Sequence, residues 1–186
     1  MAAMIWSGLT VILCNSRSTS CRFRRTQETS STLSSMFAPL ISTQLFPRSS
    51  SVLVSLVVSS SDGALLSTLI NVTTLALVDA GIPLKDYCLA TSLCFHPPVR
   101  GNDVLLLDPT SLEENDLPTL TLAVTPRDSK VCLSALYSGR GTIEGHRIAS
   151  ALHVGSEVLG GRLLDEVETT VKGWAKRLRD VASRDI

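Results

Sequence analysis

The residues in this chain that could do acid–base chemistry stand in one acidic stretch, "GNDVLLLDPTSLEEN". Asp103 and Asp108 bracket four apolar residues there, and Glu113 and Glu114 follow. Two carboxylates that act as general acid and base must converge on one point. Side chains alternate across a strand, so Asp103 and Asp108 would point to opposite faces of an unbroken strand. The spacing favours a strand that starts at Asp103 and turns at Asp108, with Glu113 and Glu114 as solvated loop charges. Catalysis by one aspartate alone stays open.

A second stretch, "SSSDGALLSTL", has the order of strand, glycine turn and helix that can present backbone N–H groups to a phosphate. It contains one glycine, lacks the G-x-x-x-x-G-K-S/T spacing of a phosphate-binding loop, and has no Arg or Lys in the turn. We therefore interpret Asp62-Gly63 as a simple start signal for a helix.

A small basic patch precedes both stretches, in "CRFRRTQE". Arg22, Arg24 and Arg25 surround Phe23, a combination that can hold an RNA backbone and stack a base. A solvated basic segment in a loose tail explains the same residues equally well. If the chain binds RNA, these three arginines are the predicted contacts.

Cysteine and histidine spacing predicts neither a metal site nor a catalytic triad. The three histidines are scattered, and His153 is expected to be packed or half-exposed on a helix. The five cysteines form no C-x-x-C or Cys/His cluster, so free buried thiols are predicted and no cofactor is expected. They are Cys14, Cys21, Cys88, Cys94 and Cys132.

Length and composition indicate one globular domain. The chain has 186 residues, of which 44% are hydrophobic and 18% charged, which is enough apolar surface for a core. The formal net charge is zero, so no global field attracts nucleic acid or an acidic membrane. The apolar run Met4–Cys14 is about half as long as a membrane span, and no Lys or Arg precedes it, so neither a membrane partner nor secretion is predicted.

The elements that must position these residues begin after an irregular or poorly ordered segment, residues 1–28. A helix is predicted over Ser30–Leu45, where Pro39 kinks it or ends its first half. The continuous β-branched run Ser51–Ser59 predicts a strand buried on both faces. An apolar core helix follows over Leu65–Ala80, and Gly81 supplies its left-handed stop.

The remainder of the chain reads as strands joined by turns and then a long helix. Alternation in the strands suggests antiparallel hairpins with one wetter face, and the amphipathic helix over Thr142–Val181 is expected to break near Gly160-Gly161. The order of elements predicts an α+β fold in which helices cover a mixed sheet. The predicted strands are Tyr87–Phe95, Val104–Leu107, Thr119–Val124 and Val131–Tyr137.

Several segments in order resemble the RNase PH family: "LISTQLFPRS", "VLVSLVVSSSDGALLSTLINVTTLALVDAGIPLKD", "NDVLLLDPTSLEENDLPTLTLAV" and the long terminal helix. Within the family, "LVDAGIP" and "LLLDPTS" look most like the ring subunits of the eukaryotic exosome. The resemblance covers the chain from roughly Arg24 onward and implies a ribosomal protein S5 domain 2-like fold. It further implies other RNase PH-like ring subunits, S1 and KH cap proteins and RNA as partners, in the nucleus, nucleolus and cytoplasm.

The departures from the family pattern imply a subunit without catalytic activity. Active relatives follow the D-G turn with "GTR"-like residues that hold the attacking phosphate, whereas Leu65 and Leu66 stand here. Asn102 takes the place of an aspartate six residues before Asp108, although a shift of one residue would put Asp103 there. These three residues, Asn102, Asp103 and Asp108, are vestigial candidates for a catalytic site.

The start of the chain departs as well. Residues 29–186 are expected to form an RNase PH-like domain that lacks its first strands, which would leave the strand at Ser51–Ser59 without its usual neighbours. A phosphorolytic 3′-to-5′ exoribonuclease and a truncated, non-functional fragment are the alternatives to a structural exosome subunit.

Overall fold

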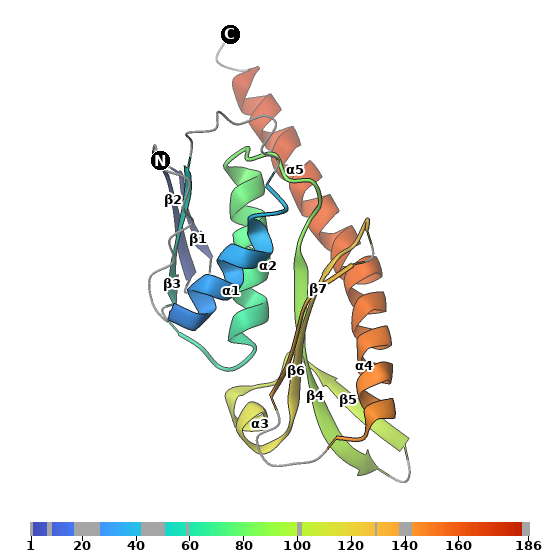
Figure 1. Cartoon of the computed structure of the whole chain (residues 1–186). Helices are drawn as coiled ribbons and strands as arrows, with labels where there is room; N and C mark the ends of the chain where they lie inside the picture. Colours follow the sequence, from blue (N-terminus) through green and yellow to red (C-terminus); the bar gives the residue numbers. More distant parts are fainter. Residues whose placement is uncertain are drawn as a thin grey trace.

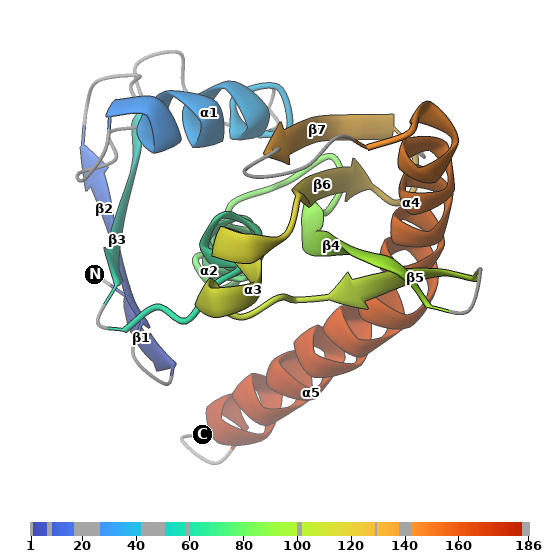
Figure 2. The same ribbon diagram turned by 90° about the horizontal axis from the view of Figure 1, so that it is seen from below.

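The computed structural model describes residues 2–6, 9–16, 27–41, 51–58, 60–99, 102–128, 130–137 and 143–183. A three-stranded sheet, a pair of helices, a four-stranded sheet and a long C-terminal helix succeed one another as layers (Figures 1 and 2). The helix α2 (Leu65–Asp79) lies between the two sheets, where it is apolar on most of its circumference, as the sequence predicts.

The first sheet contains two strands that the sequence interpretation missed. Strands β1 (Ala2–Trp6) and β2 (Leu9–Ser16) form an antiparallel pair, and β2 pairs along all of β3 (Ser51–Val58). The prediction that residues 1–28 are irregular is therefore corrected at residues 2–6 and 9–16, and so is the prediction that β3 lacks its neighbours. The apolar run Met4–Cys14, which was considered as a membrane or signal segment, contains Ser7-Gly8. This dipeptide is typical of turns and stands in the sequence between β1 and β2.

Two helices cover the inner face of this sheet. Helix α1 (Gln27–Phe37) is shorter than predicted and ends two residues before Pro39, which cannot continue a hydrogen-bonded helix. Helix α2 (Leu65–Asp79) ends as predicted, because Gly81 adopts a positive φ of 68°. Val54 of β3 is buried against these helices together with Leu33 and Phe37 of α1.

The second sheet is antiparallel throughout and has the order β5-β4-β6-β7. Its two hairpins, β4 with β5 and β6 with β7, follow the predicted strands closely. The α+β fold is confirmed, but the strands form two antiparallel sheets instead of one mixed sheet. The strands are β4 (Leu89–Val99), β5 (Asn102–Leu107), β6 (Thr119–Thr125) and β7 (Lys130–Tyr137).

The central strand β6 is buried on both faces, contrary to the prediction of a wetter one. Ala123 belongs to the core around α2, whereas Leu120 and Leu122 pack on the opposite face against the C-terminal helix. Polar side chains tie α2 to this sheet: Asn71 exchanges two hydrogen bonds of 2.8 Å with the backbone of Ala90. The orientation of α2 is thereby fixed, and with it the groups at its two ends.

The long C-terminal helix is broken where the sequence predicts a break. Helix α4 (Gly145–Val158) passes into a π-helical turn, η1 (Leu159–Leu163), which contains Gly160 and Gly161, and continues as α5 (Leu164–Ala182). Figure 1 shows α5 extending past the end of the four-stranded sheet. Among the described residues, no helix is long and apolar enough to cross a membrane.

Candidate functional site

The two stretches that the sequence singled out, the D-G turn and the acidic stretch, lie against each other. Gly63 has a φ of 95°, and a Cβ atom added to it would lie 2.3 Å from the carbonyl oxygen of Pro109. The backbone N–H of Ser111 donates to the carbonyl oxygen of Asp62 at 3.1 Å, and the Ser111 hydroxyl donates to the Asp62 carboxylate at 2.8 Å. Only glycine fits this contact, because it lacks a side chain and tolerates a positive φ.

A carboxylate from the acidic stretch occupies the N-terminal end of α2. The backbone N–H of Ala64, the N-cap residue, donates to Oε1 of Glu114 at 2.8 Å. Ala64 itself has a left-handed conformation with φ 48°, which is uncommon for a residue with a Cβ atom. The first turn of α2 has no acidic residue of its own, so Glu114 supplies the negative charge that a helix N-terminus favours.

The prediction that Glu113 and Glu114 are solvated loop charges is therefore wrong. They belong to the short helix α3 (Ser111–Asp116), and both are partly buried. Thr110 and Glu113 form a capping box: the Glu113 N–H donates to the Thr110 hydroxyl, and the Thr110 N–H donates to the Glu113 carboxylate at 2.8 Å. The T-x-x-E pattern of the sequence is the signal that could have predicted this helix.

Asp108 is exposed at the end of β5 and has a φ of 50°. Its N–H donates to the carbonyl oxygen of Ser92 at 2.8 Å, and its carboxylate accepts a long hydrogen bond of 3.5 Å from the Thr91 hydroxyl. The backbone of Asn102 and Asp103 is part of β5, but their side chains lie outside the described residues. The structure thus brings together Asp62, Asp108 and Glu114 at one turn, and the role of Asn102 and Asp103 stays a prediction.

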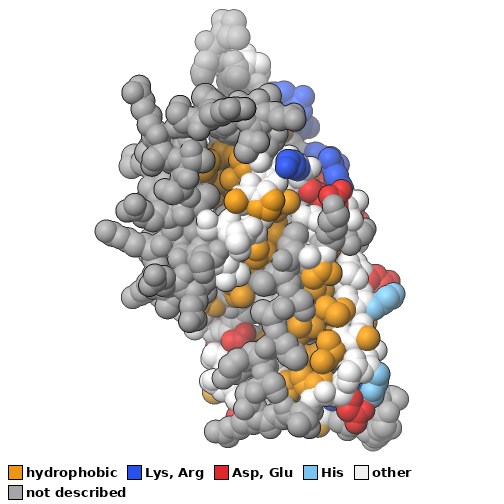
Figure 3. Space-filling view, viewed as in Figure 1, with side chains coloured by type: hydrophobic (Ala, Val, Ile, Leu, Met, Phe, Trp, Pro, Cys, Tyr) orange, Lys and Arg blue, Asp and Glu red, His pale blue; other side chains and the backbone are white. Residues whose placement is uncertain are grey.

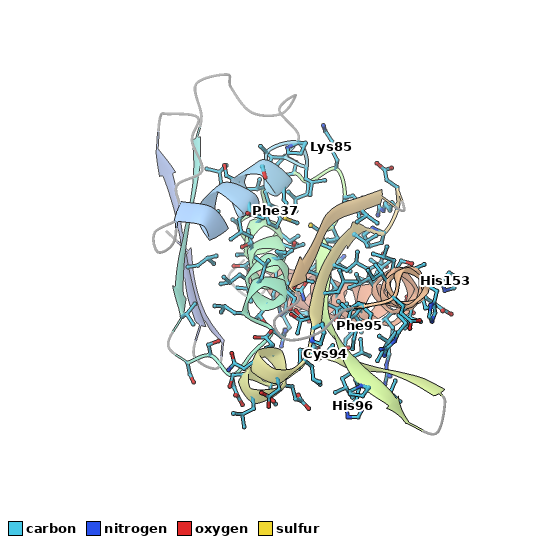
Figure 4. All side chains as sticks on the ribbon, turned by 60° about the horizontal axis from the view of Figure 1, so that its bottom comes forward. Phe37, Lys85, Cys94, Phe95, His96 and His153 are labelled. Carbon is cyan, nitrogen blue, oxygen red and sulfur yellow. The ribbon has the colours of Figure 1, made fainter. Side chains whose placement is uncertain are left out.

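A buried thiol lies beneath this acidic group. Cys94 of β4 is fully buried and free, and Figure 4 labels it beside α3. Burial raises the pKa of the Cys94 thiol above its usual range, and the charges of Glu113 and Glu114 raise it further. The thiol is therefore held in its neutral form, which is the opposite of what a nucleophilic cysteine requires.

The remaining predicted residues are the three arginines, the histidines and the other cysteines. Arg22, Arg24 and Arg25 lie outside the described residues. His153 is exposed on α4, which corrects the prediction that it is packed or half-exposed. Cys88 is buried and forms no disulfide, like Cys94, and no group of metal-ligating side chains occurs in the part of the chain that the structure describes.

Part of the sequence matches a known protein family. Residues 7–83 match the model of a family described as "3' exoribonuclease family, domain 1", RNase PH. This part of the chain is similar to an RNase PH domain. The match begins well before Arg24, where the resemblance was expected to start, and the matched region includes β2.

Proteins similar to this chain bear names of exosome components. It is 44% identical to "Exosome complex component ski6" of Schizosaccharomyces pombe over 109 residues, which are 58% of this chain and 42% of the relative. It is 38% identical to "Exosome complex exonuclease RRP46 homolog" of Arabidopsis thaliana over 87 residues, 47% of this chain and 34% of the relative. The matches thus span less than half the length of these curated relatives.

The fold has a solved counterpart. The crystal structure of Rrp46 from rice, Oryza sativa, superimposes with a TM-score of 0.69 and 21% identity, covering 90% of this chain and 86% of that one. At this identity the likeness shows the fold alone. The RNase PH-like fold that the sequence resemblance implied is confirmed.

Proposed function

We propose that this chain is a structural subunit of the RNA exosome ring, which contributes to 3′-to-5′ RNA processing and decay by assembly and contact with RNA. The observation that carries the proposal is its identity of 44% over 109 residues with a protein named as an exosome complex component. The similar protein from Arabidopsis is also named as an exosome protein.

The N-terminal end of α2 supports a subunit that has lost phosphorolysis. An attacking phosphate would need positive groups there, but the Ala64 N–H is bonded to the Glu114 carboxylate, and Leu65 and Leu66 follow it. A second anion placed beside a fixed carboxylate is repelled. The family is derived from exoribonucleases, and in this chain the end of the helix that could seat phosphate is already occupied by the protein's own charge.

A phosphorolytic exoribonuclease is the second candidate. The observation that favours it is that Asp108 and Glu114 belong to one loop and helix that pack against the D-G turn, so two carboxylates lie at the same corner of the fold. A carboxylate at this corner could take part in proton transfer. Phosphate-dependent release of nucleoside diphosphates distinguishes the two candidates.

Partners and location follow from the proposal. The expected partners are the other RNase PH-like ring subunits, S1 and KH cap subunits and RNA, in the nucleus, the nucleolus and the cytoplasm. Arg22, Arg24 and Arg25 are the proposed RNA contacts, because an Arg-rich segment around one aromatic residue can hold a phosphate backbone.

Affinity purification of the tagged full chain from its own cells tests the assembly. We expect ring subunits to co-purify in near-equal amounts and to stay bound after nuclease treatment, since the contacts are between proteins. Migration of the chain alone at its monomer mass, with no ring subunit in the purified fraction, would overturn the proposal.

A further inference from the structure

A pocket lies at the C-terminal end of α2, far from the D-G turn along the helix, and we call it the α2 pocket. Its volume is about 340 Å³, within the range of small-molecule sites. Its lining is apolar on one part and basic on another (Figure 3 shows basic side chains gathered near the upper end of the visible face). The residues that matter are Val78, Ile82, Leu84, Lys85, Tyr87 and Arg127.

A buried aspartate holds the two walls of the α2 pocket together. Asp86 accepts a hydrogen bond from the N–H of Tyr87 at 2.7 Å with one carboxylate oxygen, and one from the N–H of Arg127 at 2.9 Å with the other. Both oxygens are thus engaged by the backbone, and the turn after β6 is fixed to the segment after α2. The guanidinium of Arg127 is not used in this contact, and it makes no hydrogen bond or ion pair with a described residue, although its charge acts on Glu168 at longer range.

The basic residue on the other wall is also fixed at its backbone. The N–H of Lys85 donates to the carbonyl oxygen of Leu40 at 2.8 Å, and its ammonium group donates to the carbonyl oxygen of Pro39 at 2.9 Å. An ammonium group has three donors, so two remain for a ligand. Figure 4 labels Lys85 at the outer edge of the helix layer, where a ligand can reach it.

Neighbouring charges leave the cationic character of the α2 pocket in place. Lys172 of α5 is bonded to Glu168 at 2.8 Å, and this hydrogen bond, then the Lys172 charge, holds the pKa of Glu168 below its usual range, with a smaller effect from Arg127. The Glu168 carboxylate is therefore engaged with Lys172. Of the residues that line the pocket, only Asp86 is acidic, and its oxygens are already hydrogen-bonded.

We propose that the α2 pocket binds a phosphate monoester, with the phosphate between Arg127 and Lys85 and the organic part over Val78, Ile82 and Leu84. A guanidinium binds two phosphate oxygens in one plane, and a monoester carries a charge of nearly −2 at neutral pH, which matches two cations better than a carboxylate does. A free nucleoside monophosphate and the 5′-terminal phosphate of an RNA both present this chemistry. The site does not depend on the proposed exosome role.

Calorimetric titration of the full chain with adenosine 5′-monophosphate tests the proposal. We expect saturable binding that weakens about tenfold in Arg127→Gln and severalfold in Lys85→Gln, since each loses a charge-assisted hydrogen bond. Arg162→Gln, which removes an exposed arginine of η1 that does not line the pocket, should leave the affinity unchanged. Adenosine, which has no phosphate, should bind at least about tenfold more weakly than the monophosphate.

Two further titrations distinguish the source of the phosphate and guard against misfolding. Tighter binding of a 5′-phosphorylated RNA trinucleotide than of the mononucleotide would indicate an RNA end, and the reverse order a free nucleotide; either supports the pocket if Arg127→Gln weakens it. Arg127→Lys keeps the charge and should restore part of the affinity. The proposal is overturned if the mononucleotide does not saturate at millimolar concentration, or if Arg127→Gln and Lys85→Gln keep the affinity of the original chain.

Discussion

The charged side chains at the two ends of α2 have opposite signs and different partners. At the N-terminal end, the Glu114 carboxylate is bonded to the Ala64 N–H and the Asp62 carboxylate to the Ser111 hydroxyl. At the C-terminal end, Lys85 and Arg127 stand at a pocket. Both arrangements complement the helix dipole, so the sign of the charges is explained by helix stability alone. The difference lies in the partners: the acidic groups are hydrogen-bonded within the protein, whereas the Arg127 guanidinium makes no hydrogen bond or ion pair with a described residue and acts on Glu168 only at longer range.

This contrast separates structural charge from charge that is available to a ligand. A helix N-terminus would ordinarily attract an anion, and this one is filled by the protein's own carboxylate. The opposite end, which ordinarily repels anions, is the one with a basic pocket. Whether a charged group is available to a ligand therefore depends on its partners within the protein.

Substitution of the glycine at each end gives the largest expected effect. Gly63→Ala should lower the free energy of unfolding by about 3 kcal/mol, because the added Cβ atom meets the backbone of Pro109 and Thr110 at a positive φ. Gly81→Ala is the matched control, since it also has a positive φ but no atom within 4 Å of the added Cβ, and should cost about 1 kcal/mol. Urea denaturation measures both; equal losses would show that the contact between the two stretches does not contribute to stability.

Removal of the capping carboxylate should have the next largest effect. Glu114→Ala should lower the free energy of unfolding by about 2 kcal/mol, through the loss of the hydrogen bond to Ala64 and of the charge at the helix N-terminus. Glu157→Ala, at an exposed position of α4, is the control and should change stability by less than about 0.5 kcal/mol. Thermal and urea denaturation of both variants compares the two positions, and a loss no greater in Glu114→Ala than in the control argues against the cap.

Cys94 reports the charge of the acidic end through the pH dependence of stability. Its folded pKa is raised, so its contribution is fully present below the ordinary thiol value of 9.0 and is lost as the pH rises through the higher folded pKa. Glu114→Gln removes one of the causes and should lower this pKa, so the loss becomes smaller and is complete at a lower pH. Stability measured from neutral to alkaline pH checks this, with Cys94→Ala as the variant in which this loss should disappear.

The smallest effect is expected beside the basic end. Lys172→Gln should raise the pKa of Glu168 toward its ordinary value, since the hydrogen bond and charge of Lys172 are its main causes. Stability from this pair is present above the unfolded pKa of Glu168 and is lost as the pH falls through the lower folded one. NMR titration of the Glu168 carboxyl carbon measures the shift, which 1 M salt should reduce because both groups are exposed to solvent.

Local sequence signals predicted most of the second half of the fold. The strands β4 to β7, the stop at Gly81 and the break at Gly160-Gly161 follow from turn residues and apolar periodicity, which act over a few positions. Strands β1 and β2 were missed because their apolar run is short and was weighed only as a membrane or signal segment. The predicted fold class was nevertheless correct, because the RNase PH resemblance rests on later segments.

The candidate site and the pocket depend on contacts that sequence spacing does not reveal. The bond between Ala64 and Glu114 joins residues 50 positions apart, and the bond between Asp86 and Arg127 joins residues 41 positions apart. The capping box at Thr110 could have predicted α3, but not that Glu114 reaches another helix. Asp62 looked like the cap of α2 because it precedes the helix, yet its carboxylate bonds Ser111 of α3 instead.

The most direct test of the central claim is phosphorolysis by the purified full chain. RNA is incubated with the chain at increasing inorganic phosphate, and nucleoside diphosphates are measured, with a phosphorolytic RNase PH enzyme as the positive control. Because Glu114 fills the N-terminal end of α2, we expect no release of nucleoside diphosphates at any phosphate concentration. Release that rises with phosphate and disappears in Asp108→Asn would contradict it and establish the chain as an enzyme.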